Sequence, residues 1–129
     1  MVTIQEKDTI NINGKTIKLP CSISGYHRNN PSLIETKTLV IVNFYPYMES
    51  EVLSFGNVDR ERNIWAYDLQ GNLIWKVSPP TIRPYKSNPY TSVFEKNGKV
   101  YGGNWCGYDF EINLKDGSVT PPDKPGRPW

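Results

Sequence analysis

Histidine and cysteine are scarce in this sequence, and their scarcity excludes several kinds of active site. The chain has one histidine, His27, and two cysteines, Cys21 and Cys106. Neither the His-Glu-x-x-His nor the Cys-x-x-Cys pattern occurs, so we predict no metal site. No serine or cysteine motif accompanies His27, so we interpret it as a surface-loop residue rather than a catalytic base. The cysteines are expected to be buried thiols and not a disulfide.

Long hydrophobic runs and strong net charge are also missing. The longest apolar run, residues 39–42, is too short to cross a bilayer. The N-terminal MVTIQEKD carries acids and no apolar core of a signal peptide, so we expect a cytoplasmic protein without a membrane partner. A net charge of +2 does not by itself indicate nucleic acid. Acids gather between residues 49 and 61 and bases between 76 and 99, either as ordinary solvated surface or as two patches of opposite sign.

Glycine and proline divide the sequence into short apolar runs. Asn13-Gly14 and Asn97-Gly98 are pairs that type I′ hairpin turns favour, because both positions need a positive φ. Gly71 gives residues 68–72 similar freedom between two runs that each contain a tryptophan. We therefore predict hairpins over residues 9–19, 64–77 and 90–104.

Other segments add strands and loops. Residues 38–44 are apolar on both faces, which is typical of a central strand covered on both sides. Residues 107–114 alternate, which predicts a strand with one buried and one wet face. We further expect a strand at residues 51–55, a short helical turn at residues 30–35 with Asn30 as N-cap, and a proline-rich crossing loop at residues 78–89.

These segments predict a mainly β protein of about eight to ten short strands, with turns at intervals of about 8–12 residues. We predict one antiparallel meander curled into a half-barrel or a small barrel, with at most short helical turns. A chain of 129 residues suits a single domain, here residues 1–129. Residues 121–129 are expected to be an extended proline-rich tail.

Three strings carry a resemblance: NIWAYDLQGNLIW from residue 63, NGKVY from residue 97 and NWCGY from residue 104. The segment that holds them, residues 62–120, is similar to small bacterial proteins, and the size and all-β pattern resemble immunity proteins of contact-dependent growth-inhibition systems. The resemblance implies a cytoplasmic monomer that binds one cognate toxin domain, for example a basic nuclease, in a 1:1 complex. It implies occlusion of the toxin's active site, without catalysis or a cofactor, and it transfers no functional residue to this chain.

An aromatic and acidic stretch is the first candidate for a partner contact. It begins with Tyr45 and Tyr47, and tyrosine is frequent at interface hot spots. Its acids would meet a basic nuclease, whose substrate site is built for anions. These acids are Glu49, Glu51, Asp59 and Glu61. An ordinary polar loop is the alternative interpretation.

The tryptophans suggest a second kind of ligand. Trp75 shares strand parity with Leu73 and Val77, so we expect it to be a core anchor. Trp65 does not share strand parity with its apolar neighbours, so we expect it on the more solvent-exposed face of its strand. Trp65 and Trp105, with Tyr108 beside the latter, could stack bases, which gives a single-stranded nucleic-acid-binding barrel as the alternative function.

Asp109 and Glu111 are a pair of carboxylates on one strand face. Their spacing of roughly 6–7 Å would suit glycoside hydrolysis, which predicts a walled cleft and raised pKa values. A chain with short loops has little material for such a cleft, so we predict no enzyme and no catalytic residue. A solvated face or a charged binding surface is the simpler interpretation, and both residues join the candidate partner contacts.

Overall fold

The computed structural model describes residues 1–45, 58–80, 89–104, 107–120 and 122, and its regular structure is almost entirely β. One 3-10 turn, η1, covers Tyr26–Arg28. The strands are β1 (Val2–Glu6), β2 (Thr9–Ile12), β3 (Lys15–Lys18), β4 (Leu33–Glu35), β5 (Leu39–Asn43), β6 (Ile64–Asp68), β7 (Leu73–Lys76), β8 (Tyr90–Lys96), β9 (Lys99–Asn104), β10 (Asp109–Ile112) and β11 (Val119–Thr120).

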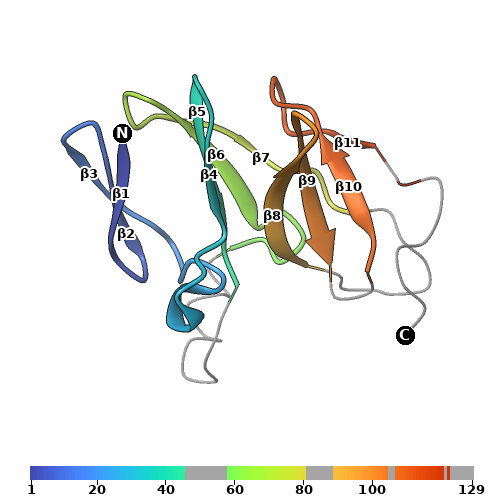
Figure 1. Cartoon of the computed structure of the whole chain (residues 1–129), viewed down its shortest axis with the longest axis horizontal. Helices are drawn as coiled ribbons and strands as arrows, with labels where there is room; N and C mark the ends of the chain where they lie inside the picture. Colours follow the sequence, from blue (N-terminus) through green and yellow to red (C-terminus); the bar gives the residue numbers. More distant parts are fainter. Residues whose placement is uncertain (46–57, 81–88, 105–106, 121, 123–129) are drawn as a thin grey trace.

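The strands form three antiparallel sheets, and within each sheet the spatial order follows the chain. Sheet A is β1-β2-β3, sheet C is β4-β5-β6-β7, and sheet D is β8-β9-β10-β11. Sheet C lies between the other two (Figure 1). The predicted mainly β, antiparallel meander is confirmed, and the strands that the structure describes do not close into a barrel.

Strand β5 explains why sheet C is the central layer. All five of its residues are buried, as predicted for a strand covered on both sides. Val40 and Val42 pack in the layer between sheets A and C, whereas Leu39 and Ile41 pack in the layer between sheets C and D. The period-2 alternation of a strand thus places apolar residues in two separate cores.

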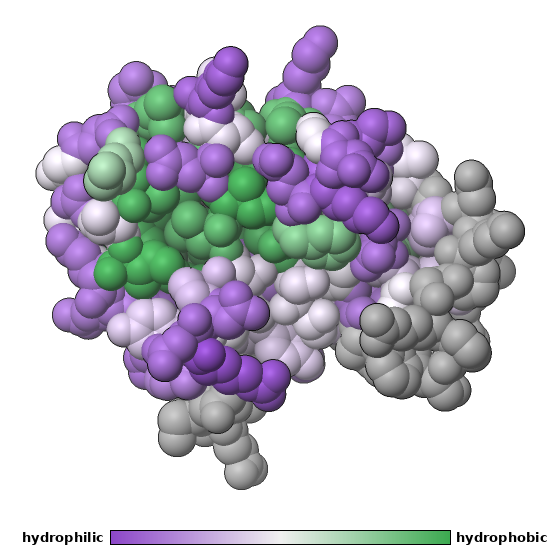
Figure 2. Space-filling model, viewed as in Figure 1, coloured by the Kyte–Doolittle hydropathy of each residue, from purple (hydrophilic) through white to green (hydrophobic). Residues whose placement is uncertain are grey.

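The two core layers draw on different residues. The A–C layer is Ile10, Ile12, Leu19, Cys21, Ile23, Val40, Val42, Phe44, Val58 and Tyr67. The C–D layer is Leu39, Ile41, Ile64, Ala66, Trp75, Val77, Tyr90, Val93, Val100, Phe110 and Ile112. Figure 2 shows apolar side chains gathered across the middle of the face in view, with polar side chains above and below them.

The predicted hairpins are confirmed. Asn13 and Gly14 have φ angles of 50° and 93°, and Asn97 and Gly98 have 53° and 78°, as a type I′ turn requires. Residues 64–77 form the hairpin of β6 and β7. Trp75 is 6% exposed, which confirms it as a core anchor.

The predicted helical turn at residues 30–35 is wrong. Leu33–Glu35 is strand β4, which pairs with β5 in the register Leu33↔Val42. The helical turn lies earlier, at Tyr26–Arg28, between Gly25 and Asn29, which both have a positive φ. Pairing with β5 places Leu33 and Ile34 against the two core layers, and this outweighs the local Asn-Pro capping signal.

Three further predictions concern membrane-spanning helices, the two cysteines and two segments of the chain. None of the helices that the structure describes is long and apolar enough to cross a membrane. Cys21 is buried, as expected, whereas Cys106 lies outside the described residues. The expected strand at residues 51–55 and the tail at 123–129 also lie outside them.

Candidate partner-binding surface

Strand β8 is at the edge of sheet D, and two serine side chains hold part of its open edge. The Val93 N–H donates to the Ser32 hydroxyl at 2.8 Å, and that hydroxyl lies 3.4 Å from the Val93 carbonyl oxygen. The Ser24 hydroxyl donates to the Thr91 carbonyl oxygen at 2.8 Å. Edge backbone groups that find no partner strand need other partners, and here hydroxyls supply them.

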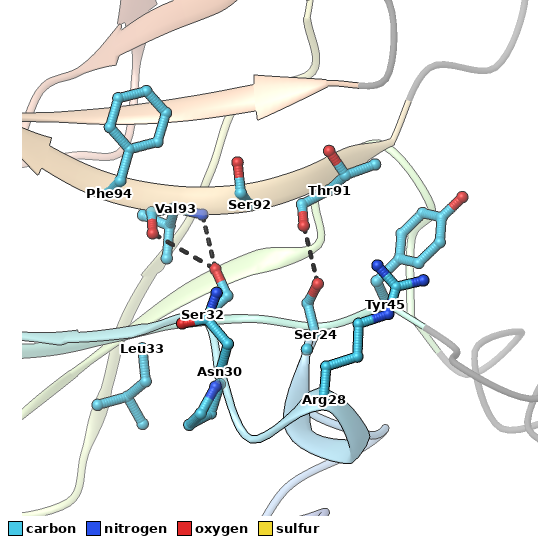
Figure 3. A pocket seen from close by; sticks show the side chains of 12 residues that line it. Ser24, Arg28, Asn30, Ser32, Leu33, Tyr45, Thr91, Ser92, Val93 and Phe94 are labelled. Carbon is cyan, nitrogen blue, oxygen red and sulfur yellow. Dashed lines mark hydrogen bonds between the residues drawn. The ribbon is translucent and has the colours of Figure 1, made fainter.

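A groove of about 750 Å³ runs along this edge (Figure 3). Its lining comes from the segment between Ser24 and Leu33, from Tyr45 at the end of β5, and from residues Thr91–Phe94 of β8. Of the described lining residues, Arg28 is the only one with a formal charge. The groove is therefore mixed in polarity, with aromatic, aliphatic, hydroxyl and guanidinium groups.

A buried amide network fixes β8 against sheet C. The Asn63 side chain donates to the Tyr90 and Phe44 carbonyl oxygens, both at 2.7 Å, and accepts from the Tyr90 N–H at 3.0 Å. The Asn43 side-chain amide also donates to the Tyr90 carbonyl oxygen, at 3.1 Å. Both asparagines are fully buried, so these bonds act where water cannot replace them.

Tyr90, which takes part in this network, ionises less readily than a solvent-exposed tyrosine. Burial raises the pKa of Tyr90, and the charge of Glu61 raises it further. The Tyr90 hydroxyl donates to the Ser78 carbonyl oxygen at 2.8 Å, so its neutral form is the one that fits the site. Thr91, which lines the groove, is the next residue after Tyr90, so the network also fixes this part of the groove wall.

Part of the predicted acidic and aromatic stretch meets at one end of sheet C. Tyr45 lines the groove. The preceding Phe44 accepts from and donates to Asn63, so the turn that contains Asp59 and Glu61 joins β6 at the same end. Asp59 is exposed and forms a 3.7 Å ion pair with Arg62. The other residues predicted here, Tyr47, Glu49 and Glu51, lie outside the described residues, as does Trp105.

Trp65 is a half-buried residue rather than an open stacking platform. It packs against the A–C layer, with its ring 5.1 Å from that of Phe44 in an edge-to-face contact. Its indole N–H donates to the Arg62 carbonyl oxygen at 2.9 Å, and the Lys76 ammonium lies 4.3 Å from the ring centroid. The ring face is therefore already in contact with a cation.

Asp109 and Glu111 lie on the outer face of sheet D, away from the groove floor. Asp109 is exposed, and Glu111 forms a 3.5 Å ion pair with Lys99. Glu111 pairs with Tyr101 on β9, and Tyr101 stacks on Phe94 with ring centroids 5.6 Å apart. The groove lining includes neither Asp109 nor Glu111.

Tyr108 neither lines the groove nor joins the Asp109 and Glu111 pair. Its ring packs against the C–D layer, and its backbone N–H donates to the Asn104 side chain at 3.2 Å. His27 is exposed in η1, as predicted, with its ring 5.5 Å from that of Tyr26. Among the described residues, no group of three or more acidic, histidine or cysteine side chains gathers in a way that could hold a metal ion.

Sequence reasoning missed most of the groove. Ser24, Ser32 and Arg28 lie in a segment without periodicity, and their roles depend on a strand about sixty residues away. Phe94 carried a usable signal, because it lies two residues after Ser92 in β8, and residues two apart on a strand share one face.

The comparisons with known proteins bear on family and not on activity. No curated protein matches the chain. No solved structure matches it either. A family model described as a domain of unknown function, DUF7957, matches residues 1–124. Because this match spans nearly the whole sequence, the chain belongs to the DUF7957 family.

Proposed function

We propose that the chain is a non-catalytic inhibitor that neutralises a cognate bacterial toxin domain by covering its active site. The observation that carries the proposal is the meeting of Tyr45, the groove along β8 and the Asp59–Glu61 turn at one end of sheet C. A tyrosine and an arginine that line one groove have the composition of an interface hot spot. The size and all-β pattern of the chain, which resemble those of immunity proteins, support the same role.

The proposed mechanism is steric and electrostatic. Tyr45 supplies contact area at little conformational cost, because its side chain has only two rotatable angles. Asp59 and Glu61 add negative charge, which favours encounter with a basic nuclease surface. The amide network around Tyr90 holds β8 in place, so the groove is preformed and binding orders few additional groups.

Co-expression with the product of the neighbouring reading frame tests the proposal. We expect that product to stop growth when expressed alone, and the chain to restore growth and to copurify with it in a 1:1 complex. Tyr45→Ala should weaken the complex by about tenfold or more, as expected for a hot-spot tyrosine. Thr16→Ala, an exposed change on β3 in sheet A, is the matched control and should leave affinity unchanged.

Two outcomes would contradict the proposal. Growth arrest that persists in the presence of the chain, with no complex formed, rules out neutralisation of that toxin domain. Salt-sensitive binding to single-stranded oligonucleotides with tryptophan quenching would instead favour the nucleic-acid alternative.

A further inference from the structure

Two exposed hairpin turns of this chain share one sequence, Asn-Gly-Lys, and one backbone conformation. Residues 13–15 follow β2 and lead into β3, and residues 97–99 follow β8 and lead into β9 (Figure 1). The asparagines have φ angles of 50° and 53°, and the glycines have 93° and 78°. A Cβ atom at either glycine would meet nothing within 4 Å, so both turns are open to solvent. The turns are thus a matched pair, and they can be compared by what their polar groups contact.

Side chains hold the first turn at two points. The Gly14 N–H donates to the Asn11 side-chain oxygen at 2.8 Å. The Asn13 side-chain amide donates to the Leu69 carbonyl oxygen at 3.3 Å, which ties this turn to the loop of the β6–β7 hairpin. Rearranging the first turn therefore breaks two hydrogen bonds besides those of the strand ladder.

The second turn has neither of these bonds. The position that corresponds to Asn11 holds Glu95, which is exposed. Among the residues that the structure describes, none accepts a hydrogen bond from the Gly98 N–H, and none bonds to the Asn97 side chain. Only the ladder of the β8–β9 hairpin closes this turn, so it opens locally at a lower cost in free energy than the first turn.

We infer that Asn97 is a site of spontaneous deamidation, and that Asn13 is protected from the same reaction by its hydrogen bonds. The backbone nitrogen of Gly98 attacks the side-chain carbonyl carbon of Asn97. A new C–N bond closes a succinimide ring, the N–H proton passes to a base in the solvent, and the side-chain nitrogen leaves as ammonia. Water then opens the ring at either carbonyl group, which gives aspartate or isoaspartate.

The hydrogen bonds of the first turn act on both reacting groups. The attack needs a free glycine N–H and an asparagine side chain that can rotate toward it. In the first turn Asn11 engages the Gly14 N–H, and Leu69 engages the Asn13 amide. Two hydrogen bonds of ordinary strength lower the population of the reactive conformation by about tenfold or more. Glycine has no Cβ to shield its nitrogen at either site, so this factor does not separate them.

Deamidation at Asn97 changes the strand that carries the groove wall. Isoaspartate adds one carbon atom to the main chain between residues 97 and 98, and a two-residue type I′ turn has no place for it. The turn follows β8, whose residues 91–94 line the groove, so the modification loosens one end of that strand. The inference goes beyond the proposed function and does not depend on it, because the reaction involves only this chain and water.

Mass spectrometry of the aged protein tests the inference. The purified chain is incubated at mildly alkaline pH and physiological temperature and is then digested with a protease that cleaves after glutamate. We expect conversion to aspartate and isoaspartate to be about tenfold faster at Asn97 than at Asn13. Enzymatic methylation of isoaspartate distinguishes it from aspartate.

Two controls separate the effect of the fold from that of the local sequence. In guanidinium chloride both sites should react at similar rates, because each asparagine is followed by Gly-Lys. Asn11→Ala removes the acceptor of the Gly14 N–H and should speed conversion at Asn13, whereas Asn11→Asp keeps an oxygen acceptor and should leave it slow. The comparison of the two sites in the unsubstituted chain does not need these variants, so it stands even where one of them unfolds.

Equal rates at the two sites in the folded protein overturn the inference, as does faster conversion at Asn13. No conversion at Asn97 on a timescale that modifies the unfolded chain also overturns it. A rate difference that persists unchanged in guanidinium chloride has the same consequence, because the local sequence and not the hydrogen bonds would then set the rate.

Discussion

Sheet C packs against sheet A on one face and against sheet D on the other, and the two contacts differ in their polar content. Between C and D, Asn43, Asn63 and Tyr90 form buried hydrogen bonds within the apolar layer. Between A and C, the described side-chain hydrogen bonds lie at the exposed rim, as where the Val2 N–H donates to Glu35. The inner A–C contact is made mainly of aliphatic side chains.

This difference teaches how the end of the molecule that carries the groove is positioned. Apolar packing is non-directional, so it holds two layers together without fixing one exact register. Buried amides require specific partners, so they fix the position of β8 relative to sheet C. The groove depends on β8, and it lies in the part of the fold with the more directional contacts.

The largest expected effect comes from breaking the amide network. Asn63→Leu removes the buried partner of the Tyr90 N–H and of the Phe44 carbonyl oxygen, and one of the two donors to the Tyr90 carbonyl oxygen, so we expect a loss of about 4 kcal/mol in the free energy of unfolding. Urea denaturation measures this value. Asn30→Ala, at an exposed asparagine, should change it by less than about 0.5 kcal/mol. Equal losses would show that the network contributes little.

A cavity in the A–C layer should have a smaller and more local effect. Ile12 is 1% exposed, and Ile12→Ala should cost about 3 kcal/mol. Hydrogen exchange should quicken in β1–β3 while the Tyr90 amide stays protected, because its partners lie in the other layer. If the β8 amides lose protection to the same extent, the two layers do not differ in the way described.

The two tryptophans of the central hairpin allow a matched comparison across sheet C. Trp75→Phe removes the buried indole bond to the Leu114 carbonyl oxygen and should cost about 2 kcal/mol. Trp65→Phe removes the bond to Arg62 at a half-exposed site and should cost less than about 1 kcal/mol. Thermal melting of the two variants decides the order, and the reverse order would contradict the assignment of Trp75 as the anchor.

The smallest effect concerns the charge pair within sheet A. Burial acts to raise the pKa of Asp8, but the hydrogen bond and the charge of Lys18 outweigh it, so the pKa is lowered below 3.8. The stabilisation is present above pH 3.8 and is lost as the pH falls through the lowered value. Asp8→Asn should remove less than about 1 kcal/mol at pH 6, and little at pH 2. Equal losses at both pH values would show that the carboxylate charge is not involved.

Local chemistry predicted much of the fold. The Asn-Gly pairs located two hairpins, because a positive φ at both turn residues strongly restricts sequence. The two-sided apolar pattern of residues 38–44 identified the central strand, and strand parity identified Trp75 as buried. In each case the information lies within a few residues of the feature.

The candidate site was less accessible to prediction. Ser24 bonds to a strand residue 67 positions away, and Ser32 to one 61 positions away, so neither role has a local signature. Strand β4 was missed because its stability comes from pairing with β5 and from contacts with both cores. Asp109 was selected for its charge, but its position across Gly103 from Ser92 follows only from the pairing of β8, β9 and β10.

Each sheet consists of one uninterrupted stretch of chain, and the stacking order A, C, D repeats the order of synthesis. During translation, sheet A and then sheet C can pair their strands without waiting for later residues. Tyr90 is the first residue of sheet D to emerge from the ribosome, and it is also the one that Asn43 and Asn63 bind. The amides can therefore act as a docking template, which captures sheet D as it emerges and completes the groove along β8.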